Sequence, residues 1–300
     1  MDKISFIIIS FNRPDDTIEA VKSILSQDKF PKDGEIIVVN NNSDLSYKSF
    51  ENFLESNGDA KRATKYIESP TNLGVAKGRN LGIKSATGDL LFFIDDDATF
   101  KDTNVITYTK ELFKKYENRN LGIVAYNEHL VKEGKFNPPT KSSELAKEKE
   151  FFTWYFIGCG HAIKREVLDG VGIYRDESFY GMEEYDLAYR VIDNGYSIFY
   201  TSEVEILHMK NPMGRQSKHK VAQMLMVNKT IIAYRYLSNT YAFSHLALWS
   251  GLLMIKHPLH FFQNLITIFG LVKKLKNTPR EPISKDALKY IKDVQGRLWY

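Results

Sequence analysis

The stretch Leu90-Leu91-Phe92-Phe93-Ile94-Asp95-Asp96-Asp97 decides the fold of this chain. Its five consecutive apolar residues are typical of a strand that is buried on both faces. Three carboxylates follow at once, although clustered carboxylates repel one another and are costly to desolvate. A bound divalent cation with oxygen ligands explains them best, and a solvated acidic turn is the alternative. Because open α/β sheets bind ligands at the carboxyl ends of their strands, the stretch predicts an α/β fold with a ligand site there.

Strand-like and helix-like segments alternate along the first 126 residues. The expected strands are residues 4–10, 35–39, 66–68, 90–94 and 121–126, and the expected helices are residues 14–26, 74–86 and 101–116. This alternation predicts a mostly parallel sheet with right-handed crossovers and helices on its faces. The pattern then changes: residues 127–150 predict a loop or partial helix, residues 183–194 a helix, and two strand-like runs, 196–201 and 204–207, precede His208.

Charge is divided unevenly along the chain. The net charge is +4, but residues 209–300 contain 15 Lys and Arg against 3 Asp and Glu, whereas residues 1–208 contain 26 against 34. A basic segment on an acidic body is typical of proteins that bind an anionic surface. Because the basic residues flank Leu- and Phe-rich helices, we expect an anionic membrane as the partner and no nucleic acid.

The cysteine content and the start of the sequence indicate a compartment. The single cysteine, Cys159, excludes an intrachain disulfide framework and fits a reducing environment. Residues 1–5 lead directly into a strand-like run and lack the plan of a signal peptide. We therefore expect a cytoplasmic protein, held peripherally on the cytoplasmic face of the cell membrane.

Five motifs, in order over roughly residues 3–210, resemble those of family 2 glycosyltransferases of the inverting, rhamnosyltransferase-like kind that builds bacterial cell-surface glycans. The motifs are residues 7–13 (IIISFNR), 36–44 (IIVVNNNSD), 72–80 (NLGVAKGRN), 95–97 (DDD) and 181–190 (GMEEYDLAYR). The resemblance implies the GT-A nucleotide-diphospho-sugar transferase fold, with a mostly parallel central sheet flanked by helices and a C-terminal helical extension.

The resemblance also implies a donor site for a UDP- or dTDP-linked sugar. Asp97 is expected to coordinate Mn²⁺ or Mg²⁺ directly, Asp95 to reach the metal through water or to contact the ribose, and His208 to be a third ligand. The residues expected at the donor nucleotide are Ser10, Phe11, Asn12, Arg13, Asn41, Arg79, Asp95 and Asp96. Asn41 falls where many relatives have an aspartate that accepts the imide N–H of uracil or thymine, and an amide oxygen also accepts. The alternatives are a surface histidine for His208 and an ordinary helix-face ion pair for Arg79.

An inverting transfer needs a carboxylate that takes the proton of the acceptor hydroxyl. Glu184 lies six residues before Arg190, where the similar motif has its base, so we expect Glu184 to be the catalytic base. Glu183 and Asp186 are expected to share a helix face and to support the acceptor or the motif. Trp154 is a candidate for stacking on an acceptor sugar, with core packing as the alternative. A solvated helix start is the alternative for the three acids.

We expect a GT-A catalytic domain over residues 1–212, with a donor nucleotide-binding half (1–126) and an acceptor half (127–212). Residues 213–300 are expected to form a basic, amphipathic helical extension that binds the membrane or caps the core, because no apolar run reaches the length of a membrane span. The expected acceptor is a glycan, lipid-linked in view of the basic extension. Two other functions stay open: a catalytically silent glycan- or membrane-binding scaffold, and a sugar-phosphate nucleotidyltransferase.

Overall fold

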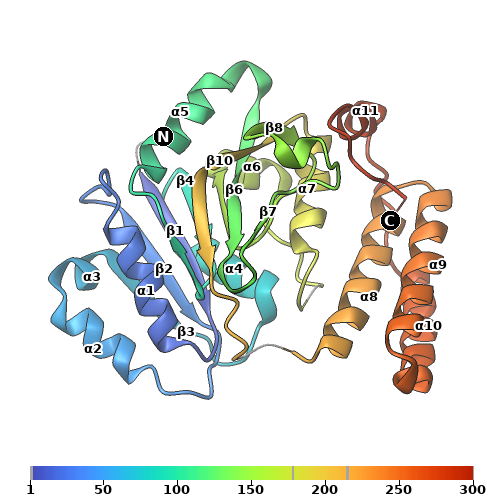
Figure 1. Cartoon of the computed structure of the whole chain (residues 1–300), viewed down its shortest axis with the longest axis horizontal. Coiled ribbons are helices and arrows are strands. Elements are labelled where there is room, and N and C mark those ends of the chain that lie inside the picture. The colour runs from blue at the N-terminus through green and yellow to red at the C-terminus, as the bar shows by residue number, and fades with distance from the viewer. Residues whose placement is uncertain (1–2, 178, 214–215, 300) are drawn as a thin grey trace.

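The computed structural model describes residues 3–177, 179–213 and 216–299, and one ten-stranded sheet forms its centre (Figure 1). The strands are β1 (Ile4–Ser10), β2 (Glu35–Asn40), β3 (Thr64–Glu68), β4 (Leu90–Ile94), β5 (Ala98–Phe100), β6 (Leu121–Leu130), β7 (Lys135–Asn137), β8 (Glu150–Thr153), β9 (Gly160–Lys164) and β10 (Ser197–His208). The helices are α1 (Pro14–Leu25), α2 (Lys48–Ser56), α3 (Gly58–Ala63), α4 (Gly74–Ser85), α5 (Val105–Lys115), α6 (Arg165–Val171), α7 (Glu183–Asp193), α8 (Lys218–Tyr236), α9 (Asn239–Lys256), α10 (Phe261–Lys276) and α11 (Lys285–Asp293).

The sheet has the strand order β3-β2-β1-β4-β9-β6-β10-β5, with β7 beside β6 and β8 beside β10. The expected parallel pairing holds for β3, β2, β1 and β4. β9 lies antiparallel between β4 and β6, and β5, β7 and β8 also pair antiparallel, so the second half of the sheet is mixed. The α/β fold with helices on the sheet is therefore confirmed, and the run of parallel strands lies within residues 1–126, which we expect to be the donor half.

Two local expectations were wrong. Residues 127–137 are not a loop or partial helix, because β6 continues to Leu130 and β7 pairs with it, whereas residues 138–149 are irregular apart from a 3-10 turn at Leu145–Lys147. The two strand-like runs before His208 form one strand, β10, whose register shifts between Tyr200 and Glu205. Polar strand residues are stabilised here by partners from distant parts of the chain, which local propensity does not reveal.

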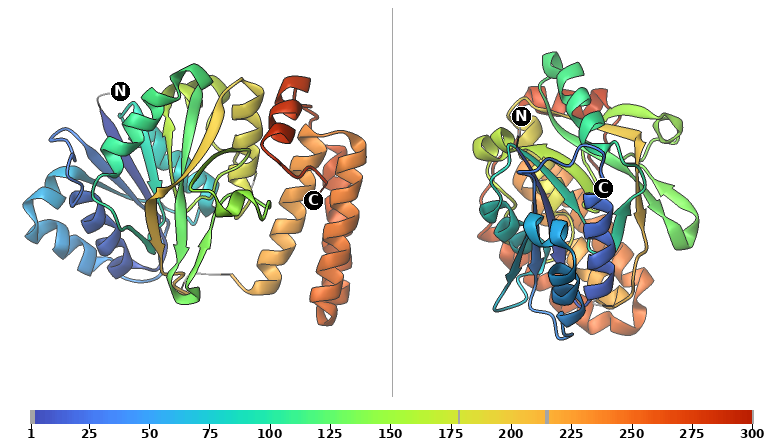
Figure 2. Two further views of the ribbon diagram at one scale, coloured as in Figure 1. Left: turned by 45° about the horizontal axis from the view of Figure 1, so that its top comes forward. Right: turned by 90° about the vertical axis from the view of Figure 1, so that its left-hand side faces the viewer.

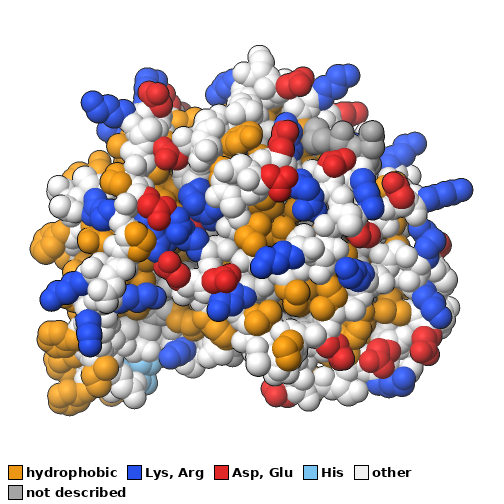
Figure 3. All heavy atoms as spheres, turned by 180° about the vertical axis from the view of Figure 1, so that it is seen from behind, with side chains coloured by type: hydrophobic (Ala, Val, Ile, Leu, Met, Phe, Trp, Pro, Cys, Tyr) orange, Lys and Arg blue, Asp and Glu red, His pale blue; other side chains and the backbone are white. Residues whose placement is uncertain are grey.

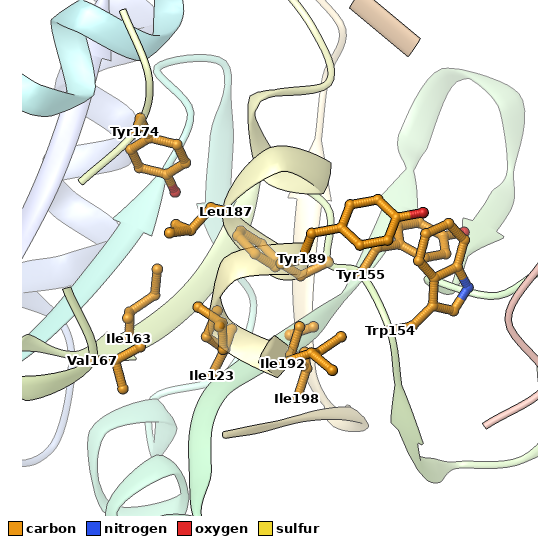
Figure 4. Packing of buried hydrophobic residues seen from close by; sticks show 14 of the residues in the cluster. Ile123, Trp154, Tyr155, Ile163, Val167, Tyr174, Leu187, Tyr189, Ile192 and Ile198 are labelled. Carbon is orange, nitrogen blue, oxygen red and sulfur yellow. The ribbon is translucent and has the colours of Figure 1, made fainter. Parts of the chain in front are cut away.

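Alternate residues of the central strands face two separate cores. In β4, Leu91 and Phe93 pack in the core beneath α4, α6 and α7, whereas Phe92 packs in the core beneath α1, α2 and α5. This is the two-residue period of a strand covered on both faces. Figure 4 shows part of the first core, in which Ile163, Val167 and Leu187 converge from three elements.

The C-terminal helices form a second body beside the sheet. Helices α8, α9 and α10 lie side by side at the right of Figure 1 and share a small core of Met226, Ile231, Leu253 and Leu271. Figure 2 shows the same arrangement from two other directions. The α11 segment packs on α7 and contributes to the main core. None of the described helices is both long and apolar enough to cross a membrane. The domain boundary near residue 212 stays a prediction.

Helix α4 packs closely on β1 because Gly82 has no side chain: a methyl group there would lie 2.5 Å from Ile7 Cγ2. We predict that Gly82→Ala lowers the free energy of unfolding by about 1–3 kcal/mol through overpacking. Gly170→Ala is the matched control, since this glycine in α6 has open space around it. The control should be neutral or stabilising by up to about 1 kcal/mol. Urea unfolding measures both, and equal stabilities would contradict the packing described here.

Candidate functional site

A cavity of about 190 Å³ opens at the carboxyl ends of β1, β2 and β4. Its lining residues come from these strand ends, the start of α4, the segment before α7 and the end of β10: Ile9, Phe11, Arg13, Asn41, Asn72, Gly74, Val75, Asp95, Asp96, Asp97, Phe179, Tyr180, His208 and Gln216. The position is where open α/β sheets bind ligands, as the sequence predicts. Asn72, Val75, Phe179, Tyr180 and Gln216 were not anticipated, since they face the cavity only through the packing of their segments.

Asp95, Asp97 and His208 form one cluster beside this cavity. Their ligand atoms all lie within 4.8 Å of one another, and His208 Nε2 is 3.2 Å from an oxygen of Asp97. Two carboxylates and an imidazole are a suitable donor set for Mn²⁺, and for Mg²⁺ through the carboxylates. The residues predicted as metal ligands are thus brought together, although 110 residues or more separate His208 from the two acids.

Glu128 is a member of the site that the sequence analysis missed. Its carboxylate accepts a hydrogen bond of 2.5 Å from His208 Nδ1, which fixes the ring with Nε2 toward Asp97. Such a carboxylate partner orients a metal-binding histidine and makes it more basic. Glu128 lies in the segment that we had predicted to be irregular, and only its pairing in β6 brings it to His208.

Asp96, expected at the donor nucleotide, is occupied by protein groups. One of its oxygens accepts from Phe11 N at 2.9 Å and the other from Arg13 Nη1 at 2.6 Å. Burial raises the pKa of Asp96 to about 7, even though Arg13 opposes the shift. Arg13 also donates to the carbonyl groups of Asn211 and Met213. The pair therefore joins the turn after β1 to the segment after β10 and shapes one wall of the cavity.

Ser10 and Asn12 do not line the cavity, in contrast to the expectation. The Ser10 hydroxyl is buried against Thr17 and Tyr47. Asn12 adopts a left-handed conformation, with φ of 60°, and its side-chain oxygen accepts from the amides of Asp44 and Leu45. Both side chains bind the segments that surround the cavity and do not line the cavity itself.

Asn41 does line the cavity, and its amide group is already engaged. Its oxygen accepts from Leu73 N at 2.9 Å, and its nitrogen donates to Gly74 O at 3.2 Å. Gly74 has φ of 74°, and a methyl group there would lie 2.4 Å from Phe179 O. The carboxamide, which pairs with a backbone N–H and a C=O at once, thus fixes the turn that starts α4.

Arg79 lies beside the site but does not line the cavity, and its expected contact with the diphosphate stays a prediction. Its guanidinium is 2.7 Å from Glu184, 3.2 Å from Glu183 and 3.4 Å from Asp95, and it donates to Gly158 O. Burial lowers the pKa of Arg79, but Glu184 and the other neighbouring acids outweigh it and raise the pKa well above its usual value. Arg79 therefore connects Asp95, one of the candidate metal ligands, to the acidic motif.

The acidic motif follows a strained turn. Gly181 and Met182 both have positive φ, of 80° and 74°, and such a conformation is rare for a residue with a side chain. Asn228 of α8 holds the turn by donating to the carbonyl groups of Tyr180 and Gly181. The turn presents Glu184 with 13% of its side chain exposed, whereas Glu183 is 4% exposed. Burial and the charge of Glu184 raise the pKa of Glu183 to about 8.

Asp186 has other partners than Glu183, and the expectation that both acids support the acceptor or the motif stays a prediction. Asp186 is buried, and Arg190, Arg235 and Tyr236 bind its carboxylate. Its environment is that of an anchor between α7 and α8. Of the three acids only Glu183 and Glu184 contact Arg79.

Trp154 is 7% exposed and packs against Tyr155, Tyr185 and Tyr189. Figure 4 shows it at the edge of the buried cluster, beyond α7. Trp154 belongs to the main hydrophobic core, as the alternative of core packing expects, and it also lines a second cavity. Stacking of Trp154 on an acceptor sugar stays a prediction.

His208 makes the stability of the metal-free protein depend on pH. Burial lowers the pKa of His208, but its hydrogen bonds to Asp97 and Glu128 raise it to about 9 overall. The stabilisation of the folded state by protonated His208 is therefore complete below the unfolded-state pKa of about 6.5. It is lost as the pH rises through 9. In the presence of chelator, the unfolding free energy of the unchanged protein should decrease between these pH values. In the His208→Asn variant we expect this decrease to be smaller by up to about 3 kcal/mol. His129→Asn, which changes a histidine outside the cluster, should leave the decrease intact. Urea unfolding across this pH range is the measurement, and equal slopes for both variants would contradict the assignment.

Comparison with known proteins shows which family the chain is similar to. The model of "Glycosyl transferase family 2" matches residues 5–172. A Haemophilus influenzae protein described as "Uncharacterized protein" is 29% identical over 56% of this chain and 91% of its own length. The GalNAc(5)-diNAcBac-PP-undecaprenol beta-1,3-glucosyltransferase of Campylobacter jejuni is 30% identical over 61% of this chain. The match spans 58% of that enzyme's length.

Solved structures agree on the fold. Mannosyltransferase PcManGT from Pyrobaculum calidifontis, in complex with GDP-Man and Mn²⁺, has a TM-score of 0.59 at 18% identity and covers 97% of this chain and 78% of its own. S. aureus TarS in complex with UDP-GlcNAc has a TM-score of 0.60 at 17% identity and covers 92% of this chain and 84% of its own. These neighbours confirm the GT-A fold with C-terminal helices. Because the family model matches more than half of its length, the chain belongs to glycosyl transferase family 2.

Proposed function

We propose that this glycosyltransferase moves a sugar, with inversion, from a UDP- or dTDP-linked donor to a glycan acceptor and depends on Mn²⁺ or Mg²⁺. The observation that carries the proposal is the chain of contacts from His208 and Asp97, through Asp95 and Arg79, to Glu184. It links the candidate cation ligands of the cavity to a carboxylate that is 13% exposed. Such a pair is what a transfer with an anionic leaving group requires.

On the donor side, Asp95, Asp97 and His208 would hold the cation. A cation held there would neutralise the charge that develops on the diphosphate as the bond from its oxygen to the anomeric carbon breaks. Phe11 lines the cavity together with Asn41 and Val75, so it offers an aromatic face for the nucleoside base. These residues are the basis for proposing a pyrimidine nucleotide.

On the acceptor side, Glu184 is the proposed base. Its carboxylate would take the proton of the acceptor hydroxyl while that oxygen forms the new bond to the anomeric carbon and the nucleoside diphosphate leaves. Arg79 orients Glu184 through the 2.7 Å ion pair, and Glu183 supports the pair from below. Asp186 contributes indirectly, because it anchors α7 to α8 through Arg235 and Tyr236.

We further propose that the acceptor is lipid-linked and that the protein binds the cytoplasmic membrane face peripherally. The name of the C. jejuni relative includes an undecaprenol-linked substrate. In this chain Phe262, Ile266 and Phe269 are each more than 70% exposed and follow one another at helical spacing on α10. Figure 3 shows apolar side chains gathered at the lower left, at the end of the helical body formed by α8, α9 and α10. Lys273, Lys274 and Lys276 end the same helix, which suits an anionic bilayer.

The donor site is tested by calorimetric titration with UDP, dTDP and GDP, each with Mn²⁺, with Mg²⁺ and with chelator. We expect UDP or dTDP to bind only with metal. Asp97→Asn should weaken binding by at least about tenfold, because a ligand charge is lost. Asp89→Asn, at an exposed position that does not line the cavity, should bind as the unchanged protein does. Binding by no nucleotide, with the protein folded, would contradict the donor assignment.

The base is tested by Glu184→Gln. Transfer should fall by a factor of about 10² or more, because general-base catalysis is lost, while nucleotide binding stays within a few-fold. Donor hydrolysis and transfer to a glycan primer are both measured, since the acceptor is not specified. Glu166→Gln, a change at an exposed glutamate of α6, is the control. Retention of transfer by Glu184→Gln would disprove this role.

The membrane surface is tested by co-sedimentation with vesicles of phosphatidylglycerol and phosphatidylcholine. Replacing Phe262, Ile266 and Phe269 by Ser should reduce binding by at least about tenfold, since each side chain contributes about 1–2 kcal/mol when buried. Phe136→Ser, which changes an exposed phenylalanine on β7, is the control. Equal binding by both variants, or none by the unchanged protein, would contradict the proposal.

A further inference from the structure

A second cavity, of about 200 Å³, lies between α7, α8 and α9. Its wall is formed by Lys141, Trp154, Met182, Tyr185, Tyr189, Lys229, Ile232, Ala233, His245, Trp249 and Arg297. None of these residues lines the first cavity. Tyr185 and Tyr189 belong to α7, so this helix has the acidic motif at its start and a wall of the second cavity along its side.

The second cavity is basic and aromatic. Lys141, Lys229 and Arg297 line it, and no described Asp or Glu does. Lys229 Nζ lies 3.6 Å from the centre of the Trp249 ring. Burial, with the charge of Lys141, lowers the pKa of Lys229 to about 8. A partly buried cation with another cation as its charged neighbour is costly, and an anion bound beside it would reduce that cost.

Two polar atoms in the wall have no hydrogen-bond partner among the described residues. They are Trp249 Nε1, which is a donor, and His245 Nδ1. The other ring nitrogen of His245 donates to Leu298 O at 3.0 Å, and burial lowers the pKa of His245, so Nδ1 of the neutral ring is an acceptor. Buried polar atoms are nearly always paired, so two unpaired buried atoms in side chains that line a cavity favour a ligand that pairs with them.

We propose that this cavity binds a phosphate monoester that carries an apolar group. The phosphate oxygens would accept from Lys229 and from the indole N–H of Trp249, and the hydroxyl of the monoanion would donate to His245. The apolar group would pack against Trp154, Tyr185 and Tyr189. Lys141 and Arg297 also line an open polar hollow with Ser142, Ser143 and Gln295, which offers a route of entry. The proposal stands independently of the proposed function, and the ligand is either a soluble ester or a lipid phosphate.

The test uses octyl phosphate below its micellar concentration, with inorganic phosphate and octyl glucoside as the two partial ligands. Binding is followed by calorimetry and by the fluorescence of the three tryptophans. We expect octyl phosphate to bind at least about tenfold more tightly than inorganic phosphate, and octyl glucoside to show no saturable binding. Lys229→Met should weaken octyl phosphate binding by about tenfold or more, because a charge-assisted hydrogen bond is lost. Trp249→Phe should weaken it less and should abolish most of the fluorescence change.

Lys256→Met is the matched control, since this lysine ends the same helix as Trp249 but does not line the cavity. Lys229→Gln is the second variant, and nucleotide binding and circular dichroism check that both Lys229 variants fold. Displacement of octyl phosphate by phosphatidic acid vesicles assigns the ligand to lipid, and lack of displacement assigns it to a soluble ester; both support the site. Equal binding of octyl phosphate and inorganic phosphate, or unchanged binding by both folded Lys229 variants, would overturn the proposal.

Discussion

The buried guanidinium of Arg79 is the contact on which the site depends. It extends from α4 and meets Asp95 at the end of β4, Glu183 and Glu184 at the start of α7, and the carbonyl of Gly158. At 5% exposure such a cation is tolerable only with its acids around it, and the acids are tolerable only with the cation. The ends of β4 and α7 are therefore held together by one buried side chain.

A similar buried charge group fixes the C-terminal helices to the same centre. Asp186 lies behind the acidic motif and binds Arg190 within α7, and Arg235 and Tyr236 in α8. Asn228 of α8 holds the strained turn that precedes Glu183. The helical extension is thus a structural part of the site, because it sets the position of the motif whose second acid we propose as the base.

Most of the elements could be predicted from the sequence, since apolar period and turn residues are local signals. The uninterrupted apolar run of β4 predicted a strand covered on both faces, and the structure has a core on each. The polar segment around Glu128 gave no such signal, because its partners in β7 and β10 lie elsewhere in the chain. Its role beside His208 was missed for the same reason.

The residue types and their order along the chain define the family, the fold and the cluster of Asp95, Asp97 and His208, because strand ends in such a sheet share one edge. Which polar groups face the cavity was decided by packing. Ser10 and Asn12 belong to the expected motif, yet their side chains bind neighbouring loops and do not line the cavity, whereas Asp96 lines it with its carboxylate bound to Arg13. Asp186 and Arg79 likewise turn to buried partners. The partner of a side chain depends on which distant segment of the chain packs against it. The spacing of residues along the sequence does not reveal which segments pack together.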